Sequence, residues 1–338
     1  MNKWVQLTVG FLLSFVGLFF AFKNLEVSSI SKSFQSLNYF WILASIAALF
    51  LSAVVRSLRW RLLLISIKPV ELKSLFASTM IGYFGNSALP FKMGEVLRGY
   101  YISTLKNIKT STVLGSIVLE RTCDLVGLIM TFACVSLFYS FDYEIKLSLI
   151  FTIFVLSILI LFFLFTFFKK NVFFKKVLNF SKQRSQFFFK LSNMLRSFAK
   201  GFNAISSFNV LFMILLYTVA LWILFFLSTY FTVLAFGFDL SILEVGVILL
   251  LTSLAMSIPA APGAIGTHHF AAYYVMTTMF LFPEAESQSF AIVLHAVSYV
   301  PLAFCGAFYF FSSSLRICLL YTSPSPRDAH ESRMPSSA

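Results

Sequence analysis

Charged residues are scarce in this sequence. They make up 12% of its 338 residues, whereas a typical soluble domain has about 25%. Hydrophobic residues account for 59%, and phenylalanine alone occupies 44 positions, which is more apolar surface than a soluble fold of this size can cover. The composition argues against a soluble enzyme, a secreted disulfide scaffold and a nucleic-acid-binding domain. It predicts an all-α polytopic membrane protein, because helices satisfy their own backbone hydrogen bonds in lipid.

Acidic residues and cysteines are also few. There are 13 Asp and Glu residues against 26 Lys and Arg residues, which gives a formal net charge of +13. In a membrane chain such a charge indicates basic cytoplasmic loops, and we expect no nucleic-acid partner. Cys123, Cys134 and Cys305 lie in apolar runs, and no Cys-x-x-Cys or Cys/His metal spacing is present. The sequence therefore predicts neither a metal nor another cofactor.

The sequence contains several long apolar segments. A membrane-spanning helix needs about 20 apolar residues. We expect a single transmembrane domain over residues 1–316, with about six spanning helices and two re-entrant helical hairpins. The expected spans are 4–22, 38–58, 111–139, 147–168, 208–237 and 289–315. The expected hairpins are 74–105 and 244–282, which are apolar but interrupted by Gly, Pro and polar residues.

The stretch 169–200 predicts the orientation of the chain. It contains nine Lys and Arg residues and no Asp or Glu, so the positive-inside rule places it in the cytoplasm. Counting spans from this stretch puts the N-terminus in the cytoplasm of a cell-membrane protein; the first hairpin then enters from the cytoplasm and the second from outside. Interleaved Phe and Leu residues predict an amphipathic helix on anionic lipid, and a solvated basic loop is the alternative.

The two broken segments share a pattern. Each has a Pro, a Gly four residues later and then a Tyr-Tyr pair: Pro90, Gly94 and Tyr100-Tyr101 in the first, Pro262, Gly266 and Tyr273-Tyr274 in the second. Such a pair is typical of the inverted repeats of transporters, and chance similarity is the alternative. Backbone broken at membrane depth is buried in protein or lines a wet cavity. A half-helix N-terminus there favours a phosphate or carboxylate, and a packing kink without a ligand is the other interpretation.

A run of charges lies inside one predicted span. Glu120 is about ten residues, or about 15 Å, from the start of that helix, where each charge costs roughly 2.5–3.5 kcal/mol to insert. Arg121 and Asp124 are three residues apart and can pair on one face. Glu120 is then expected to pair with a hairpin residue such as Lys92 or Arg98. These charges indicate a substrate pathway, and a purely structural ion-pair network is the alternative.

Further polar residues gather at three other places. The first hairpin carries Asn86, Lys92, Glu95 and Arg98. Arg56 and Arg59 share a helix face beside Trp60, where they are either interfacial anchors or bidentate ligands of a lipid phosphate. His268 and His269 follow the second hairpin turn and diverge by about 100° on a helix, which disfavours a shared metal. A histidine lining a polar cavity can titrate near neutral pH, and ordinary helix packing is the alternative.

These motifs together resemble a flippase-like membrane family that includes the transmembrane region of lysylphosphatidylglycerol synthases. The matching pieces, in the family's order over 4–316, are Arg56-x-x-Arg59-Trp60, Asn86-x-x-x-Pro90-x-x-x-Gly94-Glu95-x-x-Arg98, Glu120-Arg121-x-x-Asp124 and Pro259-x-x-Pro262-Gly263-x-x-Gly266. The resemblance implies translocation of lipids with anionic or zwitterionic headgroups, such as aminoacylated phosphatidylglycerol or polyprenyl-linked sugars. Many members have an acidic residue near the position of His269, so the histidine there leaves the choice of headgroup open.

We therefore expect a lipid transporter with a headgroup cavity between the hairpins and the charged helix. The expected substrate-binding residues are Arg56, Arg59, Asn86, Pro90, Gly94, Glu95, Arg98, Glu120, Arg121, Asp124, Pro262, Gly263, Gly266, Thr267, His268 and His269. An intramembrane glycosyl or phosphoryl transferase, with Glu120 or Asp124 as base or metal ligand, is one alternative, although no DxD or HxxxH motif is present. A scaffold for a separate lipid-modifying synthase is another. We do not expect the soluble aminoacyl-transferase domain of the synthases here.

The composition changes after Arg316. Residues 319–338 are polar and rich in Pro and Ser, which predicts disorder. They also resemble the peptide that results when sequencing-adapter DNA is translated at the end of an assembled read. We therefore expect 319–338 not to be native protein, and an ordinary disordered cytoplasmic tail is the alternative.

Overall fold

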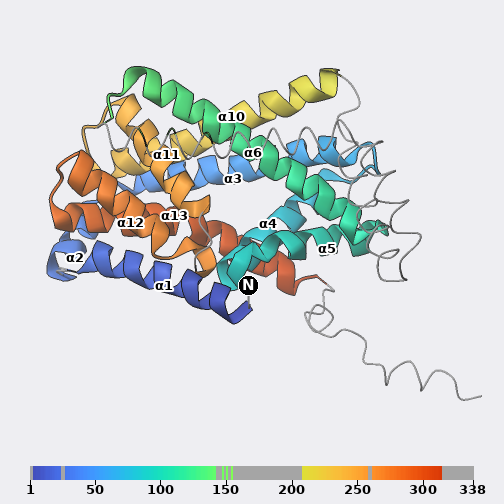
Figure 1. Ribbon diagram of the computed structural model, residues 1–338, viewed down its shortest axis with the longest axis horizontal. Coiled ribbons are helices and arrows are strands. Elements are labelled where there is room, and N and C mark those ends of the chain that lie inside the picture. Colours follow the sequence, from blue (N-terminus) through green and yellow to red (C-terminus); the bar gives the residue numbers. More distant parts are fainter. Residues whose placement is uncertain are drawn as a thin grey trace, which may run out of the picture.

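The structure, a computed structural model, describes residues 3–23, 27–141, 208–257 and 261–313 and the isolated positions 147, 150 and 154. Within these ranges every regular element is a helix, as Figure 1 shows, which confirms the all-α class. Most of the predicted span 147–168, the whole basic stretch 169–200 and the tail 319–338 lie outside the described residues. The expectations for those segments stay predictions.

Four of the described helices are long and apolar enough to cross a membrane. They are α3 (Tyr39–Leu64), α6 (Thr110–Phe138), α10 (Phe208–Phe236) and α13 (Glu284–Phe311). Each coincides with a predicted span, but α3 continues past its predicted end at residue 58. The arginines that suggested an interface at that end are buried inside the protein, so the helix runs through them.

Two helices precede these spans. α1 (Lys3–Phe22) covers the first predicted apolar run. It packs tightly on the second hairpin, because a Cβ at Gly17 would lie 2.8 Å from the carbonyl oxygen of Gly266, and the Ser14 hydroxyl accepts a backbone hydrogen bond from the hairpin at 2.8 Å. The sequence did not predict α2 (Val27–Gln35), because nine mostly polar residues give no membrane-span signal.

Each predicted hairpin is a pair of helices joined through a short 3-10 turn. The first consists of α4 (Leu72–Ala88), the turn η1 (Pro90–Lys92) and α5 (Gly94–Lys106). The second consists of α11 (Ile242–Ser257), the turn η3 (Pro262–Ala264) and α12 (Thr267–Tyr274), followed by a π-helical turn, η4 (Val275–Met279). A proline begins each 3-10 turn, where it cannot continue the preceding helix because it lacks a backbone N–H.

The two turns share an unusual backbone conformation. In η1, Phe91 and Lys92 have φ angles of 56° and 54°, and in η3, Gly263 and Ala264 have φ angles of 68° and 53°. Residues other than glycine seldom adopt positive φ. Two consecutive positive angles directly after each proline therefore support a structural repeat over a chance resemblance of two Gly/Pro breaks. The inverted orientation of the two units stays a prediction.

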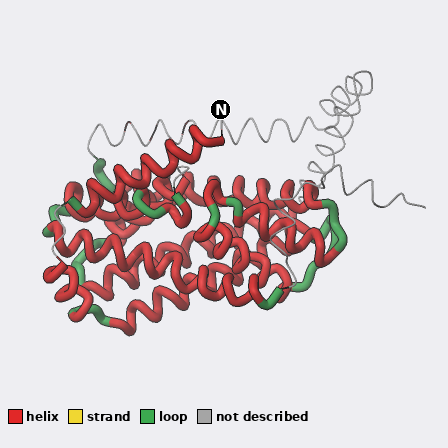
Figure 2. Tube along the Cα trace, turned by 90° about the horizontal axis from the view of Figure 1, so that it is seen from below, coloured by secondary structure: helices red, strands yellow, loops and turns green. Residues whose placement is uncertain are grey.

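The two halves of the molecule meet along α3 and α10, which pack side by side. The Ser45 hydroxyl of α3 bonds to the hydroxyls of Ser228 and Thr232 on α10, at 2.8 and 3.1 Å. Figure 2 shows helices running mainly in one direction, with most loops at the two ends. The turns η1 and η3 touch one another, and a Cβ at Gly263 would lie 4.0 Å from the Cα of Ser87. The hairpin turns thus meet between the helices.

Candidate functional site

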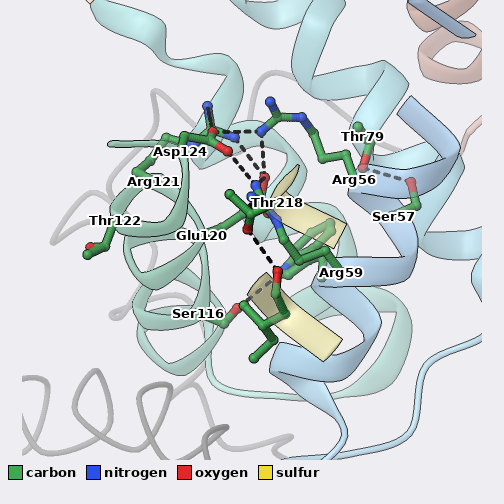
Figure 3. Close-up of polar contacts among 12 residues, drawn as sticks. Arg56, Ser57, Arg59, Thr79, Ser116, Glu120, Arg121, Thr122, Asp124 and Thr218 are labelled. Carbon is green, nitrogen blue, oxygen red and sulfur yellow. Dashed lines mark hydrogen bonds and ion pairs between the residues drawn. The ribbon is translucent and has the colours of Figure 1, made fainter. Parts of the chain in front are cut away.

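Seven charged residues from three helices form one network, which we call the ion cluster. They are Arg56 and Arg59 of α3, Glu95 and Arg98 of α5, and Glu120, Arg121 and Asp124 of α6. Figure 3 shows the part of the cluster that α3 and α6 build. Members of one helix that are three or four residues apart share a face, and Arg121 follows Glu120 directly. Three motifs that are far apart in the sequence therefore converge.

Glu120 is the centre of the ion cluster. Its side chain is 0% exposed, and its carboxylate accepts hydrogen bonds from Arg56 at 2.8 Å, Arg98 at 3.1 Å and Arg121 at 2.7 Å. Arg59 lies 3.8 Å away. A carboxylate at this depth stays charged only when it is paired and hydrogen-bonded. The expected pairing with Arg98 is present, and three more guanidinium groups join it.

The other two carboxylates link the same arginines into a connected network. Asp124 pairs with Arg59 at 2.5 Å, with Arg56 at 2.9 Å and with Arg121 at 3.0 Å. Glu95 pairs with Arg98 at 2.5 Å and lies 3.7 Å from Arg121. Every arginine therefore contacts at least two carboxylates, and Arg121 contacts all three. The expected pairing of Arg121 with Asp124 is confirmed.

The ion cluster is closed on one side and open on the other. The side chains of Arg59 and Arg98 are 0% and 2% exposed, whereas that of Arg121 is 40% exposed. The carboxylates beside Arg121 are also partly accessible. Lys92 projects from the nearby turn η1, is exposed, and lies within electrostatic reach of Arg121. A ligand that reaches the cluster would therefore meet Arg121 first.

Neighbouring side chains hold the buried arginines in place. The guanidinium of Arg98 lies over the ring of Trp60, 4.7 Å from its centroid, and the Trp60 indole donates a hydrogen bond to Ser116 at 3.1 Å. Arg59 donates to the hydroxyl of Thr218 on α10 at 3.1 Å. No sequence pattern singles out Ser116 or Thr218, because a lone hydroxyl in an apolar helix is common.

The charges of the ion cluster do not cancel. Four arginines face three carboxylates, which leaves one formal positive charge. The Nε atoms of Arg56, Arg59 and Arg121 are buried, and they have no hydrogen-bond partner among the described residues. Uncompensated buried charge is costly. A phosphate group would supply both the missing negative charge and acceptor oxygens in the geometry that guanidinium groups prefer.

The first hairpin turn sits beside this cluster. Pro90 begins the turn, and Gly94 begins α5 one turn before Arg98. A Cβ at Gly94 would collide with the carbonyl oxygen of Gly82 and with the backbone of Asn86, so only glycine permits the close crossing of α4 and α5. The Oδ1 atom of Asn86 is buried and has no hydrogen-bond partner among the described residues.

The second hairpin turn contributes no side chain to the ion cluster within the described residues. Its members Pro262, Gly263, Gly266, Thr267, His268 and His269 pack instead between α1, α4 and α13. The rings of His268 and His269 both lie against His295 of α13. His295 is not among the expected site residues, because only the packing of α12 on α13 brings it there. Pro259 lies outside the described residues.

Two interpretations of the sequence need correction. Arg56 and Arg59 are not interfacial anchors, because their side chains are 7% and 0% exposed and both are bonded to Asp124. Trp60 beside them is fully buried as well. Lys92 was a candidate partner of Glu120, but Arg98 occupies that position. Both corrections arise because α5 and α6 cover the end of α3, which a sequence pattern does not reveal.

The fold and the ion cluster define an all-α integral membrane protein with a charged network buried among its helices. Residues 7–306 match the family described as the lysylphosphatidylglycerol synthase TM region, and the chain belongs to this family. It is 28% identical over 230 residues to the UPF0104 membrane protein MJ1078 of Methanocaldococcus jannaschii, an alignment that covers 68% of this chain and 93% of that protein. No solved structure matches the chain. The family connects the protein with membrane lipids.

Proposed function

We propose that the protein moves a lipid with a phosphate-containing headgroup between membrane leaflets, and that the ion cluster binds the headgroup. The observation that carries the proposal is the buried cluster itself, with its excess positive charge and its accessible Arg121. An aminoacyl-phospholipid or a polyprenyl-linked glycan is the substrate class. The acyl or prenyl chains stay in the lipid, and the headgroup enters between the helices of a multi-pass cell-membrane protein.

Arg121 is the exchangeable member of the cluster. It now shares its guanidinium between Glu120 at 2.7 Å and Asp124 at 3.0 Å. A phosphate oxygen can replace these contacts, because both carboxylates keep Arg56 as a partner, at 2.8 and 2.9 Å. The carboxylates released from Arg121 can then accept hydrogen bonds from an amine on an aminoacylated headgroup. Lys92 adds a second cation at the entrance.

The paired hairpins support a transport role rather than simple binding. Two similar helix–turn–helix units with matching positive-φ turns touch at their tips. In the orientation expected from the basic stretch 169–200, one hairpin enters from each side of the membrane. Inverted repeats of this kind permit alternating access, because one unit can rock against the other around a fixed central site.

A lipid-scrambling assay tests the proposal. The full chain is reconstituted with acyl-labelled fluorescent phosphatidylglycerol, and movement between leaflets is followed with an impermeant quencher. Arg121→Gln should slow this movement about 10- to 100-fold, since a hydrogen bond to a charged group contributes about 1.5–3 kcal/mol. The matched control is Arg61→Gln, which removes the same charge from an exposed position of α3. We expect this variant to behave like the wild type.

The outcomes separate the competing functions. Folded wild-type protein that leaves the labelled lipid in its original leaflet would contradict a transport role. Equal rates for the two arginine variants would show that the ion cluster does not bind the headgroup. A chemically altered lipid recovered from the vesicles would instead indicate an intramembrane enzyme.

A further inference from the structure

Three histidines form a second polar group, apart from the ion cluster. His268 and His269 lie on α12 and His295 lies on α13. The ring centroids of His269 and His295 are 4.3 Å apart, and those of His268 and His295 are 5.3 Å apart. Tyr299 stacks on His295 with centroids 4.6 Å apart and an angle of 20° between the rings. We call these residues the histidine cluster.

The hydrogen bonds leave basic nitrogens available in this cluster. His295 Nε2 lies 2.8 Å from the carbonyl oxygen of Gly263, and a carbonyl only accepts, so Nε2 carries a hydrogen and Nδ1 is the basic nitrogen. His269 Nδ1 accepts a long bond of 3.5 Å from the N–H of Gly266. His268 is 3% exposed, and its Nδ1 is buried without a hydrogen-bond partner among the described residues. Polar atoms this deeply buried are usually satisfied.

No ion pair joins these histidines to a carboxylate within the described ranges. α12 itself adds Tyr273 and Tyr274, and α1 presents the ring of Phe22 to His269. The titratable side chains of α13 within the cluster are His295 and Tyr299, whereas its acidic residues, Glu284 and Glu286, lie in its first turn. The acidic side chain of α11, Glu244, bonds to Ser241 at 2.7 Å. A protonated imidazole here would therefore add a positive charge without a resident counterion.

The hairpin turns lie between the histidine cluster and the ion cluster. Tyr299 stacks on His295, and the ring of His295 bonds to the carbonyl oxygen of Gly263 in η3. The turn η3 touches η1, and η1 leads into α5, which carries Glu95 and Arg98 of the ion cluster. Contiguous packed contacts of this kind can couple the two clusters.

We propose that His268, His269 and His295 form a proton-binding site that takes up one proton when the headgroup phosphate binds at the ion cluster. The inference rests on the proposed lipid transport. The proton comes from water on the side open to the site and adds to one imidazole nitrogen, His268 Nδ1 or His295 Nδ1, to give an imidazolium. It leaves to water on the other side after the lipid departs. No bond other than N–H forms or breaks.

The short distances between the imidazole rings limit the histidine cluster to one proton. A second proton would place two positive charges within 6.4 Å of each other, where they repel strongly in a medium of low dielectric constant. One proton then accompanies one phosphodiester, which carries a single negative charge. For a headgroup without an amine, such as phosphatidylglycerol, the pair is neutral, so a pH gradient drives transport and a membrane potential does not.

A gradient experiment tests this coupling. The full chain is reconstituted with acyl-labelled phosphatidylglycerol, the membrane potential is clamped with potassium and valinomycin, and a gradient of about one pH unit is imposed. The labelled lipid should accumulate in the leaflet that faces the alkaline side, up to about tenfold, because one proton per lipid transmits the full gradient. His268→Gln combined with His295→Gln should abolish this accumulation. Ser298→Ala, next to Tyr299 on α13 with its hydroxyl bonded within its own helix, is the matched control.

A second measurement observes the proton directly and does not depend on transport. The sequence has four histidines, and His330→Gln removes the one outside the cluster. Nitrogen-15 NMR of histidine-labelled protein then reports only His268, His269 and His295. Short-chain phosphatidylglycerol should convert one imidazole per chain to imidazolium at neutral pH, whereas the three should stay neutral without it. The pKa of a histidine side chain in water is about 6.5.

The two readouts distinguish failure of this inference from failure of the proposed transport. The proton site would be overturned if the labelled lipid moved without accumulating on either side of the pH gradient. It would also be overturned if the three imidazoles titrated identically with and without lipid. Neither result would contradict the proposed transport. Lipid-linked protonation without movement of the labelled lipid would uphold the proton site and overturn the proposed transport. Retained accumulation in the double histidine variant would overturn the assignment to these residues.

Discussion

Replacing Glu120 by glutamine removes the central carboxylate of the ion cluster and preserves its shape. Glu120 has no exposed side-chain surface and contacts Arg56 at 2.8 Å and Arg121 at 2.7 Å. After the substitution four arginines face two carboxylates, so the formal excess of positive charge doubles. Removing one partner of a buried ion pair costs about 3–5 kcal/mol. We expect a loss of this size in the free energy of unfolding.

The loss can be measured as reversible unfolding of the purified protein in mixed micelles. Circular dichroism follows the helix content as the mole fraction of denaturing detergent increases. Glu71→Gln is the matched control, because Glu71 is 76% exposed and pairs with Lys106 at 3.4 Å. Exposed pairs of this kind contribute about 0–1 kcal/mol. Equal destabilisation by the two substitutions would refute the view that the ion cluster stabilises the helical bundle.

A double substitution examines whether the cost comes from the network. Arg98 pairs with Glu120 at 3.1 Å, and Glu95 is its other partner, at 2.5 Å. Combining Glu120→Gln with Arg98→Gln restores an excess of one positive charge. The double variant should therefore be more stable than the sum of the single losses predicts, by about 0.5–3 kcal/mol. Strict additivity would show that the two side chains act independently.

Two further substitutions probe how the helices are joined. Gly94→Ala places a Cβ against the carbonyl oxygen of Gly82 and should destabilise the protein by about 1–3 kcal/mol in the same unfolding assay. Gly99→Ala meets only the ends of flexible side chains, Leu114 at 3.0 Å and Ile117 at 3.1 Å, and should cost clearly less. Equal costs would contradict the close crossing of α4 and α5. Ser45→Ala removes the hydroxyl hydrogen bonds between α3 and α10 and should lower the free energy of unfolding by about 0.5–1.5 kcal/mol per bond. An unchanged unfolding midpoint would show that these bonds do not stabilise the helix pair.

The spans and the hairpins were predictable because each leaves a local signal. An apolar run of sufficient length predicts α6 and α10 whatever surrounds them. A proline followed by a glycine four residues later predicts the turns η1 and η3, because proline ends one helix and glycine permits a close crossing. The short polar helix α2 leaves no such signal, and packing against the rest of the chain determines it.

The sequence by itself determined that the protein is an all-α membrane protein of this family, with charges in unusual places. Hydropathy and the order of motifs depend only on the linear sequence, so they can be recognised without knowledge of the fold. Only the tertiary structure decided the partners of those charges. Arg56 and Glu120 are 64 residues apart in the chain, and helix packing alone brings them together. The same packing places His295 against α12 and separates the histidine cluster from the ion cluster, because side chains that meet across helices are set by three-dimensional packing rather than by sequence spacing.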